Sequence, residues 1–410
     1  MTALLEKIKN TSRIDYINYL ILIYAFTLSF PSEIKRVVAI LMIILWITDR
    51  TKYDFKLPKT NLFLLFWIFI GYSLLSYFWS DVSFYEALKY IRRYWYYLSI
   101  FIIFKYLKRE YFEYTISFFL LGMLISEILS YGNYFSLWTI GLGESSNPTV
   151  FIHHTTNSIF LAIVSIFLLS KIFTEESKTK KIMYLIFFIT VTINLLVNSG
   201  RTGYFSFFIT IVISTIFIYK LKIQYIIASL FSLVLLFLLA YTFSTNFNSR
   251  LQLMKDDINQ IILNENYNTS IGARIGFWII AKDILEKDLL LGTGIANQIN
   301  IKNQIIDKNK TSDFEYVRKL EHFHNNYLEV LTQYGLVGFI LFLLIIIEIF
   351  KIKVKSFSIN LLKISALTIY LLGCFTDLLF YLKDSMIFFS FIIGIVLAQY
   401  KIEYQNSTKI

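Results

Sequence analysis

The chain of 410 residues is long enough for two or three soluble domains, but its composition excludes that organisation. Apolar residues make up 56% of it, charged residues only 16%, and there are 40 Phe and 29 Tyr. A soluble domain has about 25% charged residues, so this chain has too few charges to cover a globular surface. With 3 Pro, 15 Gly and no low-complexity tract, it is neither disordered nor fibrous. The remaining class is an all-α polytopic membrane protein.

The net charge of +11 would suggest nucleic-acid binding in a soluble protein. We expect no nucleic-acid partner, because the basic residues gather in particular loops between apolar runs. Cys374, the one cysteine, lies inside an apolar run, which excludes an intramolecular disulfide and a multi-cysteine metal site. Residues 1–13 are polar and the first apolar run lacks a small-residue cleavage site, so we expect no cleavable signal peptide.

A helix that crosses a bilayer needs about 20 mostly apolar residues, and the sequence contains about twelve candidates. They lie near 14–31, 35–49, 61–80, 93–107, 112–131, 157–173, 182–198, 203–219, 223–244, 326–350, 360–380 and 385–400. The sequence thus predicts transmembrane helices one to nine over 1–243 and helices ten to twelve over 326–410. One large periplasmic segment, 244–325, separates them and contains amphipathic helices.

The placement of Lys and Arg predicts the orientation. With both termini in the cytoplasm, the cytoplasmic segments hold about three times as many of these residues as the short outer segments. The positive net charge is then mainly a signal for topology and lipid headgroups. This orientation puts all four histidines on the outer side. The amphipathic stretch 274–291 is expected to lie on the membrane surface.

Two arginines stand out at the outer side. The turn N-S-G-R-T-G at 198–203 places Arg201 ahead of a helix. Arg201 either reaches to lipid headgroups or clamps an anion together with backbone N–H groups of the helix N-terminus. Arg274 opens the amphipathic stretch, where a positive charge opposes the helix dipole unless an anion binds. Otherwise Arg274 is an ordinary interfacial residue, and the following G-T-G at 292–294 is an ordinary turn.

A histidine-containing segment follows, H-N-N-Y-L-E at 324–329 and then G-L-V-G at 335–338. His324 is either a solvated loop residue or a general base, since neutral imidazole accepts protons near pH 7. Glu329 and Asp377 are both open as the carboxylate that orients it. His322 and His324 form a weaker H-x-H metal pattern without a recognisable third ligand, so we expect neither a metal nor another cofactor.

Other residues are secondary candidates for substrate contact. Arg92 and Arg93 are expected to begin the fourth span on the outer side, as interfacial anchors or as anion ligands. His154 and Asn157 are expected to start the sixth span, Arg318 precedes His324 by a few residues, and Asn325 follows it directly.

Together these segments resemble the O-antigen ligase and O-antigen polymerase superfamily of bacterial envelope glycosyltransferases. S-G-R-T-G at 199–203 is similar to the family's Ser/Arg turn, and 273–294 to its Arg-led helix ending in Gly-x-Gly. H-N-N-Y-L-E-V-L-T-Q-Y-G-L-V-G at 324–338 is similar to its His-Asn signature followed by Gly-x-x-Gly. The resemblance covers about 140–350. It departs from the family at 287–289, where Lys-Asp-Leu stands in place of a Pro ahead of the Gly-x-Gly.

The resemblance implies a glycan donor linked to undecaprenyl pyrophosphate, used at the periplasmic face of the bacterial inner membrane. Arg201 and Arg274 suit neutralisation of the pyrophosphate, and His324 suits deprotonation of the acceptor hydroxyl. A metal-independent, inverting transfer follows. Ligases transfer to lipid A–core and polymerases to another lipid-linked repeat unit, and membrane lipids are further partners.

We favour the ligase, because 244–325 is the single dominant outer segment, and keep the repeat-unit polymerase as the alternative. A protein O-oligosaccharyltransferase usually has a further C-terminal soluble domain and is not expected. Outside this class, a polysaccharide transporter or flippase would place ionisable residues deep within its spans. Glu127, one of few such residues, lies near the outer end of a predicted span.

Overall fold

A computed structural model describes residues 12–49, 60–219, 222–243, 245–264, 266–309 and 314–407, and these residues form helices and loops without a β-strand. In chain order the helices are α2 (Arg13–Thr27), α3 (Ser32–Ile47), α4 (Leu62–Leu75), α5 (Phe84–Ile91), α6 (Leu98–Tyr106), α7 (Arg109–Tyr134), α8 (His154–Thr174), α9 (Lys178–Val197), α10 (Arg201–Tyr219), α11 (Ile223–Phe243), α12 (Thr245–Asn264), α13 (Ser270–Asp288), α14 (Gln298–Asn309), α15 (Glu315–Lys319), α16 (Asn326–Lys351), α17 (Phe357–Gly373) and α18 (Lys383–Ser407). Two 3-10 turns, η1 (Ser76–Trp79) and η2 (Arg92–Tyr97), follow α4 and α5.

The protein is a multi-pass membrane protein by its apolar helices. Each of the twelve predicted ranges falls on helical structure, but among the described residues only seven helices are long and apolar enough to cross a bilayer. These seven are Leu62–Trp79, α7, α8, α9, Arg201–Ile218, α16 and Lys383–Tyr404. α2 and α3 have only 15 and 16 residues, so the count of twelve crossings stays a prediction.

The core lies around α8 and α18. In each of these helices 78% of the apolar window is buried, against 28% for the span that begins at Leu62. A helix that is apolar all round is stable only when other helices surround it. Accordingly α8 packs against α9, α10 and α17, while α18 packs against α6.

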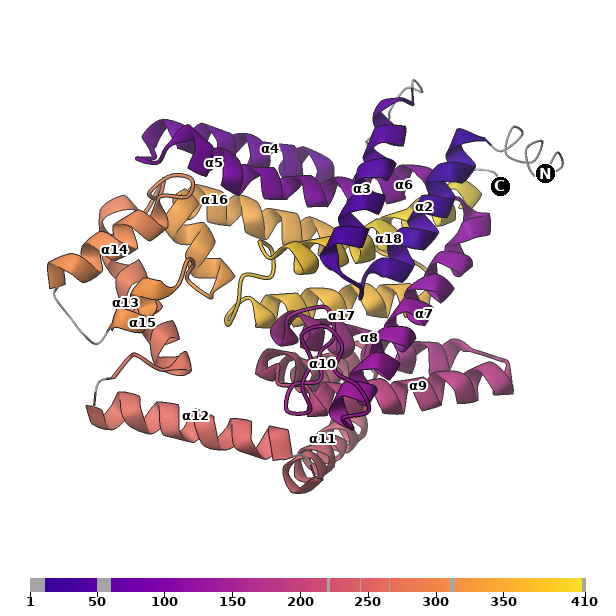
Figure 1. Ribbon diagram of the computed structural model, residues 1–410. Coiled ribbons are helices and arrows are strands. Elements are labelled where there is room, and N and C mark those ends of the chain that lie inside the picture. Colours follow the sequence, from indigo (N-terminus) through magenta and orange to yellow (C-terminus); the bar gives the residue numbers. More distant parts are fainter. Residues whose placement is uncertain are drawn as a thin grey trace.

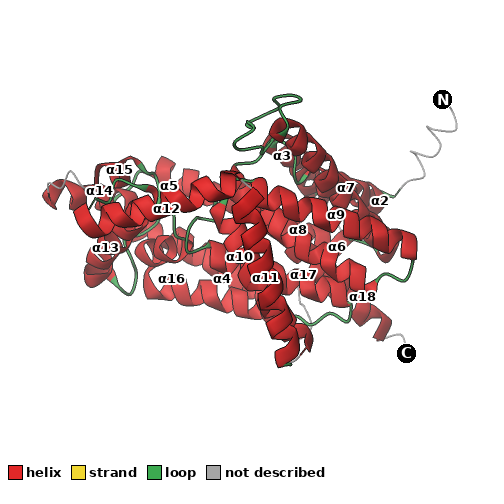
Figure 2. Cartoon of the chain, turned by 90° about the horizontal axis from the view of Figure 1, so that it is seen from below, coloured by secondary structure: helices red, strands yellow, loops and turns green. Residues whose placement is uncertain are grey.

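The two ends of the bundle differ. The N-terminal end of α2 and the C-terminal end of α18 lie at the same end, and α13, α14 and α15 lie at the opposite end (Figure 1). The view from below in Figure 2 shows the same separation between α18 and the α13–α15 group. The start of α2 and the end of α18 thus lie at the end of the bundle opposite to α13–α15, and the side of the membrane they face stays a prediction.

The fourth predicted span differs from the structure. The helical run begins at Phe84, because Ser83 and Glu86 form a capping box there, and it continues through η2 into α6. Arg92 and Arg93 therefore lie inside a helical run that begins before them, and their place at the start of a membrane span stays a prediction. Their charges lower the local hydropathy, which made the run look shorter than it is.

The α13 helix also begins earlier than predicted. Thr269 caps its N-terminus by accepting a hydrogen bond from Gly272 N, so Arg274 lies in the second turn and does not open the helix. Its buried face, with Phe277 at the centre, packs against Val317 and Phe323 in a small separate core. The opposite face exposes apolar side chains, including Trp278 at 50%, and its placement on a membrane surface stays a prediction.

The turn that contains Gly292 and Gly294 is hydrogen-bonded to α16 around Gly335. The helix α16 is interrupted at Gly335, whose φ is 60° and ψ −163°. The segment 289–294 fits into this interruption: Leu336 N donates to Leu289 O at 2.8 Å, and Gly294 N donates to Gln333 O at 2.9 Å. Gly292 and Gly294 have positive φ values of 67° and 85°, which glycine adopts without strain.

Gly335→Ala is expected to destabilise the protein strongly. An added Cβ would lie 2.3 Å from Leu290 O, on a backbone conformation that L-residues rarely adopt. Such strain costs about 1–3 kcal/mol, which a lowered melting temperature of the detergent-solubilised protein would report. The matched control is Gly71→Ala, since a Cβ there meets nothing within 4 Å. Equal melting temperatures for the two variants would contradict the assigned role of the interruption.

Candidate functional site

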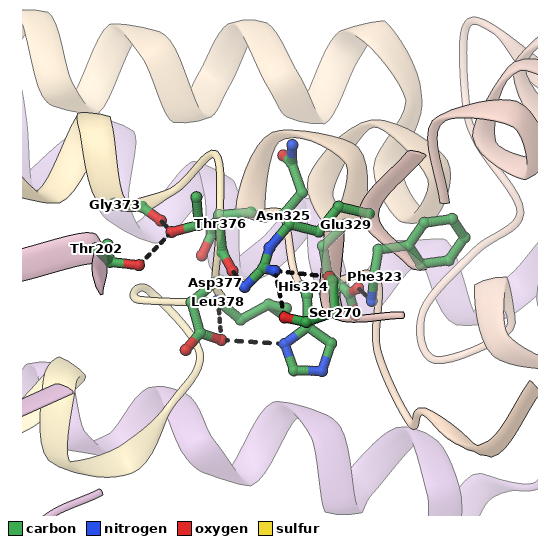
Figure 3. Close-up of polar contacts among 12 residues, drawn as sticks. Thr202, Ser270, Phe323, His324, Asn325, Glu329, Gly373, Thr376, Asp377 and Leu378 are labelled. Carbon is green, nitrogen blue, oxygen red and sulfur yellow. Dashed lines mark hydrogen bonds and ion pairs between the residues drawn. The ribbon is translucent and has the colours of Figure 1, made fainter. Parts of the chain in front are cut away.

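Four segments meet at the end of the bundle that carries α13. They are the turn before α10, the start of α13, the loop before α16 and the turn 374–382 between α17 and α18. Thr202 and Thr376 share a hydrogen bond of 2.7 Å between their hydroxyls (Figure 3). Arg274 Nη2 donates to Thr376 O at 3.4 Å. All three sequence motifs therefore surround a turn that belongs to none of them.

The two predicted arginines lie together. Arg201 Nη2 donates to Ser270 Oγ at 3.1 Å, and Arg274 Nη1 donates to Ser270 Oγ at 3.1 Å and to Ser270 O at 2.7 Å. Burial, and next the charge of Arg201, lower the pKa of Arg274. Neither guanidinium forms an ion pair with a described carboxylate, and Arg274 Nε is buried without a hydrogen-bond partner. Two cations held this close are stabilised by an anion between them.

A pocket of about 380 Å³ opens beside these arginines. Arg201 and Arg274 line it together with Thr376, and the rest of its wall is mostly apolar. The apolar part comes from four helices and consists of Phe205, Ile209, Met254, Ile271 and Leu372. The pocket thus offers positive charge and hydrocarbon side by side, as the headgroup and chain of an anionic lipid require.

His324 lies next to Asp377. His324 has a φ of 45° and a side chain that is 28% exposed, and its Nδ1 is 3.6 Å from Asp377 Oδ1 (Figure 3). Burial alone would raise the pKa of Asp377, but the hydrogen bond and charge of His324 and the N–H of Leu378 hold that pKa below its ordinary value. Asp377 is the carboxylate in contact with His324, which leaves the outer Nε2 of the ring to meet a substrate.

The two asparagines of the histidine motif hold the turn that carries Asp377. Asn325 caps α16 by accepting hydrogen bonds from Tyr327 N and Leu328 N, and its Nδ2 donates to Phe375 O at 3.3 Å. Asn326 N donates to Cys374 O at 2.8 Å. The side chain of Asn325 is therefore committed to the protein, and the structure gives it a supporting position behind the site.

Glu329, the other carboxylate considered for His324, has a different set of partners. Its side chain is 3% exposed and accepts hydrogen bonds from Phe323 N at 3.0 Å and from Gln298 Nε2 at 2.6 Å. Tyr90 Oη also donates to it at 3.3 Å. Glu329 fixes the backbone one residue before His324 and does not contact the imidazole itself.

His322 faces the same site with a neutral ring. Its ring centroid is 4.2 Å from that of His324, and its Nδ1 is buried without a hydrogen-bond partner. Burial, followed by the charge of His324, lowers the pKa of His322 to about 4. His322 is therefore uncharged near pH 7.

Of the three secondary arginine candidates for substrate contact, only Arg93 is placed near His322 and His324 by a described contact. The Arg93 guanidinium stacks on the Tyr381 ring at 4.0 Å, and its charge contributes to the lowered pKa of His322, so it lies near the site. Arg92 is exposed. The side chain of Arg318 forms an ion pair with Asp307 and is not brought to the arginine pair or to His324 by a described contact.

The start of α8 supports the Arg201 turn. A Cβ on Gly200 would lie 2.6 Å from His154 O, so His154 and, one turn later, Asn157 lie beside that turn.

Thr376 was missed in the sequence, although it contacts both Thr202 and Arg274. It carries no motif of its own, and only its position next to Asp377 could have suggested it.

Comparison with known proteins gives a family match over part of the chain. Residues 185–343 match the O-antigen ligase family. This part of the chain is therefore similar to the O-antigen ligase family. The matched range contains Arg201, Arg274 and His324 and ends before Asp377. A Haemophilus influenzae protein described as uncharacterized is 24% identical over 238 residues, which cover 57% of this chain and 59% of that protein. The chain thus matches less than two thirds of that relative.

Asp377→Asn tests the carboxylate of the His324–Asp377 pair. Because the folded pKa of Asp377 is lowered, its stabilising interaction is complete above the ordinary value near 3.8 and is lost as pH falls through the lowered value. The melting temperature of the wild type should exceed that of Asp377→Asn at pH 7, and the gap should shrink as the pH is taken towards 3. A gap that does not depend on pH would contradict the ionic interaction.

Glu329→Gln tests the anchoring of the histidine loop. The amide replaces one acceptor oxygen with a donor that faces other donors, and leaving a buried polar group unpaired costs about 1–3 kcal/mol. We expect a lower melting temperature and reduced transfer activity. Glu321→Gln is the control, since Glu321 is exposed in the same loop. If both variants behave like the wild type, Glu329 does not hold the loop.

Proposed function

We propose that this protein is an O-antigen ligase, which transfers a glycan from undecaprenyl pyrophosphate to a sugar hydroxyl of lipid A–core. It works at the periplasmic face of the bacterial inner membrane, with both termini in the cytoplasm. The observation that carries the proposal is the unpaired Arg201–Arg274 couple next to the His324–Asp377 pair. A glycosyl pyrophosphate donor needs both: positive charge for its leaving group and a base for the attacking hydroxyl.

In the proposed reaction the acceptor hydroxyl oxygen attacks the anomeric carbon of the donor. His324 Nε2 takes the hydroxyl proton, and Asp377 holds Nδ1–H and stabilises the resulting imidazolium. The bond from the anomeric carbon to the pyrophosphate oxygen breaks, and the leaving undecaprenyl pyrophosphate keeps the electron pair. Arg201 and Arg274 neutralise its charge. A single displacement inverts the anomeric carbon, and the arginines make a metal unnecessary.

The pocket at the arginines supports the donor assignment. Its charged rim suits the pyrophosphate, and its apolar wall suits the first isoprene units of the carrier. Arg93 and His154 are further candidates for donor or acceptor contact at the rim of the same site. The ligase is favoured over the polymerase because α12 to α15 form one long segment between α11 and α16.

The proposal predicts the behaviour of single substitutions in a strain that lacks the chromosomal copy of this chain. Removing one charge-stabilising donor costs about 10²- to 10³-fold in rate, and removing a general base about 10²- to 10⁴-fold. Arg201→Ala, Arg274→Ala and His324→Ala should therefore fail to restore glycan on the core. Arg109→Ala, an exposed arginine at the start of α7, is the control and should restore it.

The lipopolysaccharide pattern on a gel distinguishes the two family activities. Core without glycan, together with accumulated lipid-linked polymer, identifies a ligase. Core that carries one repeat unit identifies a polymerase and overturns the proposal. Full activity of His324→Ala at normal expression would mean that another residue is the base.

A further inference from the structure

A second, larger cavity lies between two membrane-crossing helices away from the arginines. α7 and α9 leave a groove of about 510 Å³ between them. Five apolar side chains on its wall are more than one third exposed, namely Leu121, Leu124, Ile128, Met183 and Ile186. Because both helices are apolar enough to cross a bilayer, hydrocarbon chains of a lipid are the material that fills this groove.

One carboxyl interrupts this apolar surface. Glu127 lines the groove with its side chain 3% exposed, and neither carboxyl oxygen has a hydrogen-bond partner among the described residues. The nearby hydroxyls do not donate to it: Thr190 Oγ1 donates to Phe187 O at 3.1 Å, and Tyr131 Oη donates to Thr190 O at 2.6 Å. An unpaired polar group in hydrocarbon is costly, and an ionisable residue within a span marks a functional position. An occupant of the groove with a hydrogen-bonding atom at this level can supply a partner for the carboxyl.

The depth of Glu127 limits what that partner is. Glu127 lies two turns before the end of α7 at Tyr134, about 10 Å along the helix axis. α7 has 26 residues and is about 39 Å long, against about 30 Å for the hydrocarbon core. The carboxyl thus lies a few ångströms inside the hydrocarbon boundary. Acyl lipids have ester carbonyls close to this level, whereas a polyisoprenyl chain carries no oxygen there.

We propose that the groove between α7 and α9 holds the acyl anchor of the acceptor lipid, with the protonated carboxyl of Glu127 donating a hydrogen bond to an ester carbonyl. This inference rests on the proposed ligase function. α9 ends at Val197, directly before the turn that carries Arg201, and Ser199 Oγ binds Ser146 O in the loop that follows α7. A lipid in the groove would therefore present its headgroup beside the Arg201 turn.

The two lipid positions lie on different sides of α8. This helix packs against α9 on one side and against α10, which lines the arginine pocket, on another. Donor and acceptor chains are thereby kept apart in the membrane while their headgroups meet at the outer end. A polymerase would place an isoprenyl-linked acceptor here, and an isoprenyl chain has no oxygen that could accept a hydrogen bond from Glu127.

The test uses the full chain in nanodiscs with the lipid-linked glycan donor and two acceptors. One is lipid A–core, and the other is the same core oligosaccharide released from its acyl chains. Glu127→Leu removes one hydrogen bond and should raise the KM for lipid A–core about three- to ten-fold. Ile186→Trp fills the groove and should raise it at least as much, and Glu127→Gln, which keeps a donor, should stay near the wild type.

A matched control is available on the same helix. Leu185 is 44% exposed on α9 but does not line the groove, so Leu185→Trp should leave the KM for lipid A–core unchanged. For every variant, the KM for the donor and the rate with the released core should equal those of the wild type. Melting temperatures should confirm that the variants are folded.

Two results would overturn the inference. One is an unchanged KM for lipid A–core in folded Glu127→Leu and Ile186→Trp. The other is an equal loss with both acceptors, which would indicate a structural phospholipid. Failure of the wild type to use either acceptor would reject the ligase function instead. In that case, native mass spectrometry decides on the groove: acyl lipid retained equally by wild type and Ile186→Trp would show that the groove does not hold it.

Discussion

The end of the bundle that carries α13 depends on the attachment of α16 to the turn that follows α17. The first N–H groups of a helix need partners outside the helix, and here the Asn325 side chain accepts two of them. The same side chain and the backbone of Asn326 bind carbonyls of the turn. The same two asparagines therefore cap α16 and hold the turn after α17 in place. One consequence is the strained backbone of His324, which is held at a φ of 45° with its ring towards Asp377.

The arginine pair is a second constraint, and it is electrostatic. Arg201 and Arg274 come from different helices and share the hydroxyl of Ser270, so their mutual repulsion is retained in the folded protein. Packing holds them in place, so the diphosphate of the proposed donor would meet charges that need no rearrangement. Preorganised charge of this kind is the main source of rate enhancement in many enzymes. The buried and unpaired Nε of Arg274 is the group that gains most from such a ligand.

The sequence was sufficient to predict the helical class and the three motifs, because long apolar runs and isolated charges near their ends are local signals. It was insufficient where the signal is not local. The helical run from Phe84 was missed because charged residues hide it in a hydropathy reading. The sequence also could not decide which carboxylate orients His324. Glu329 is nearer to His324 in the chain, but its oxygens accept hydrogen bonds from Phe323 N and Gln298 Nε2. Asp377 reaches His324 only through the folding of α17 back onto α16.

The packing of α8 against α10 gives a physical reason for the glycines around Arg201. A Cβ on Gly203 would lie 2.3 Å from Ser158 Cβ, and a Cβ on Gly200 would lie 2.3 Å from Ser158 Oγ. Any larger residue at either position would push α10 away from α8. Arg201 begins α10 and Thr202 binds Thr376, so that movement would separate the arginine from Ser270 and from the turn that orients Asp377. Gly200 and Gly203 therefore allow α10 to approach α8 closely, and this close packing places the Arg201 guanidinium next to Arg274.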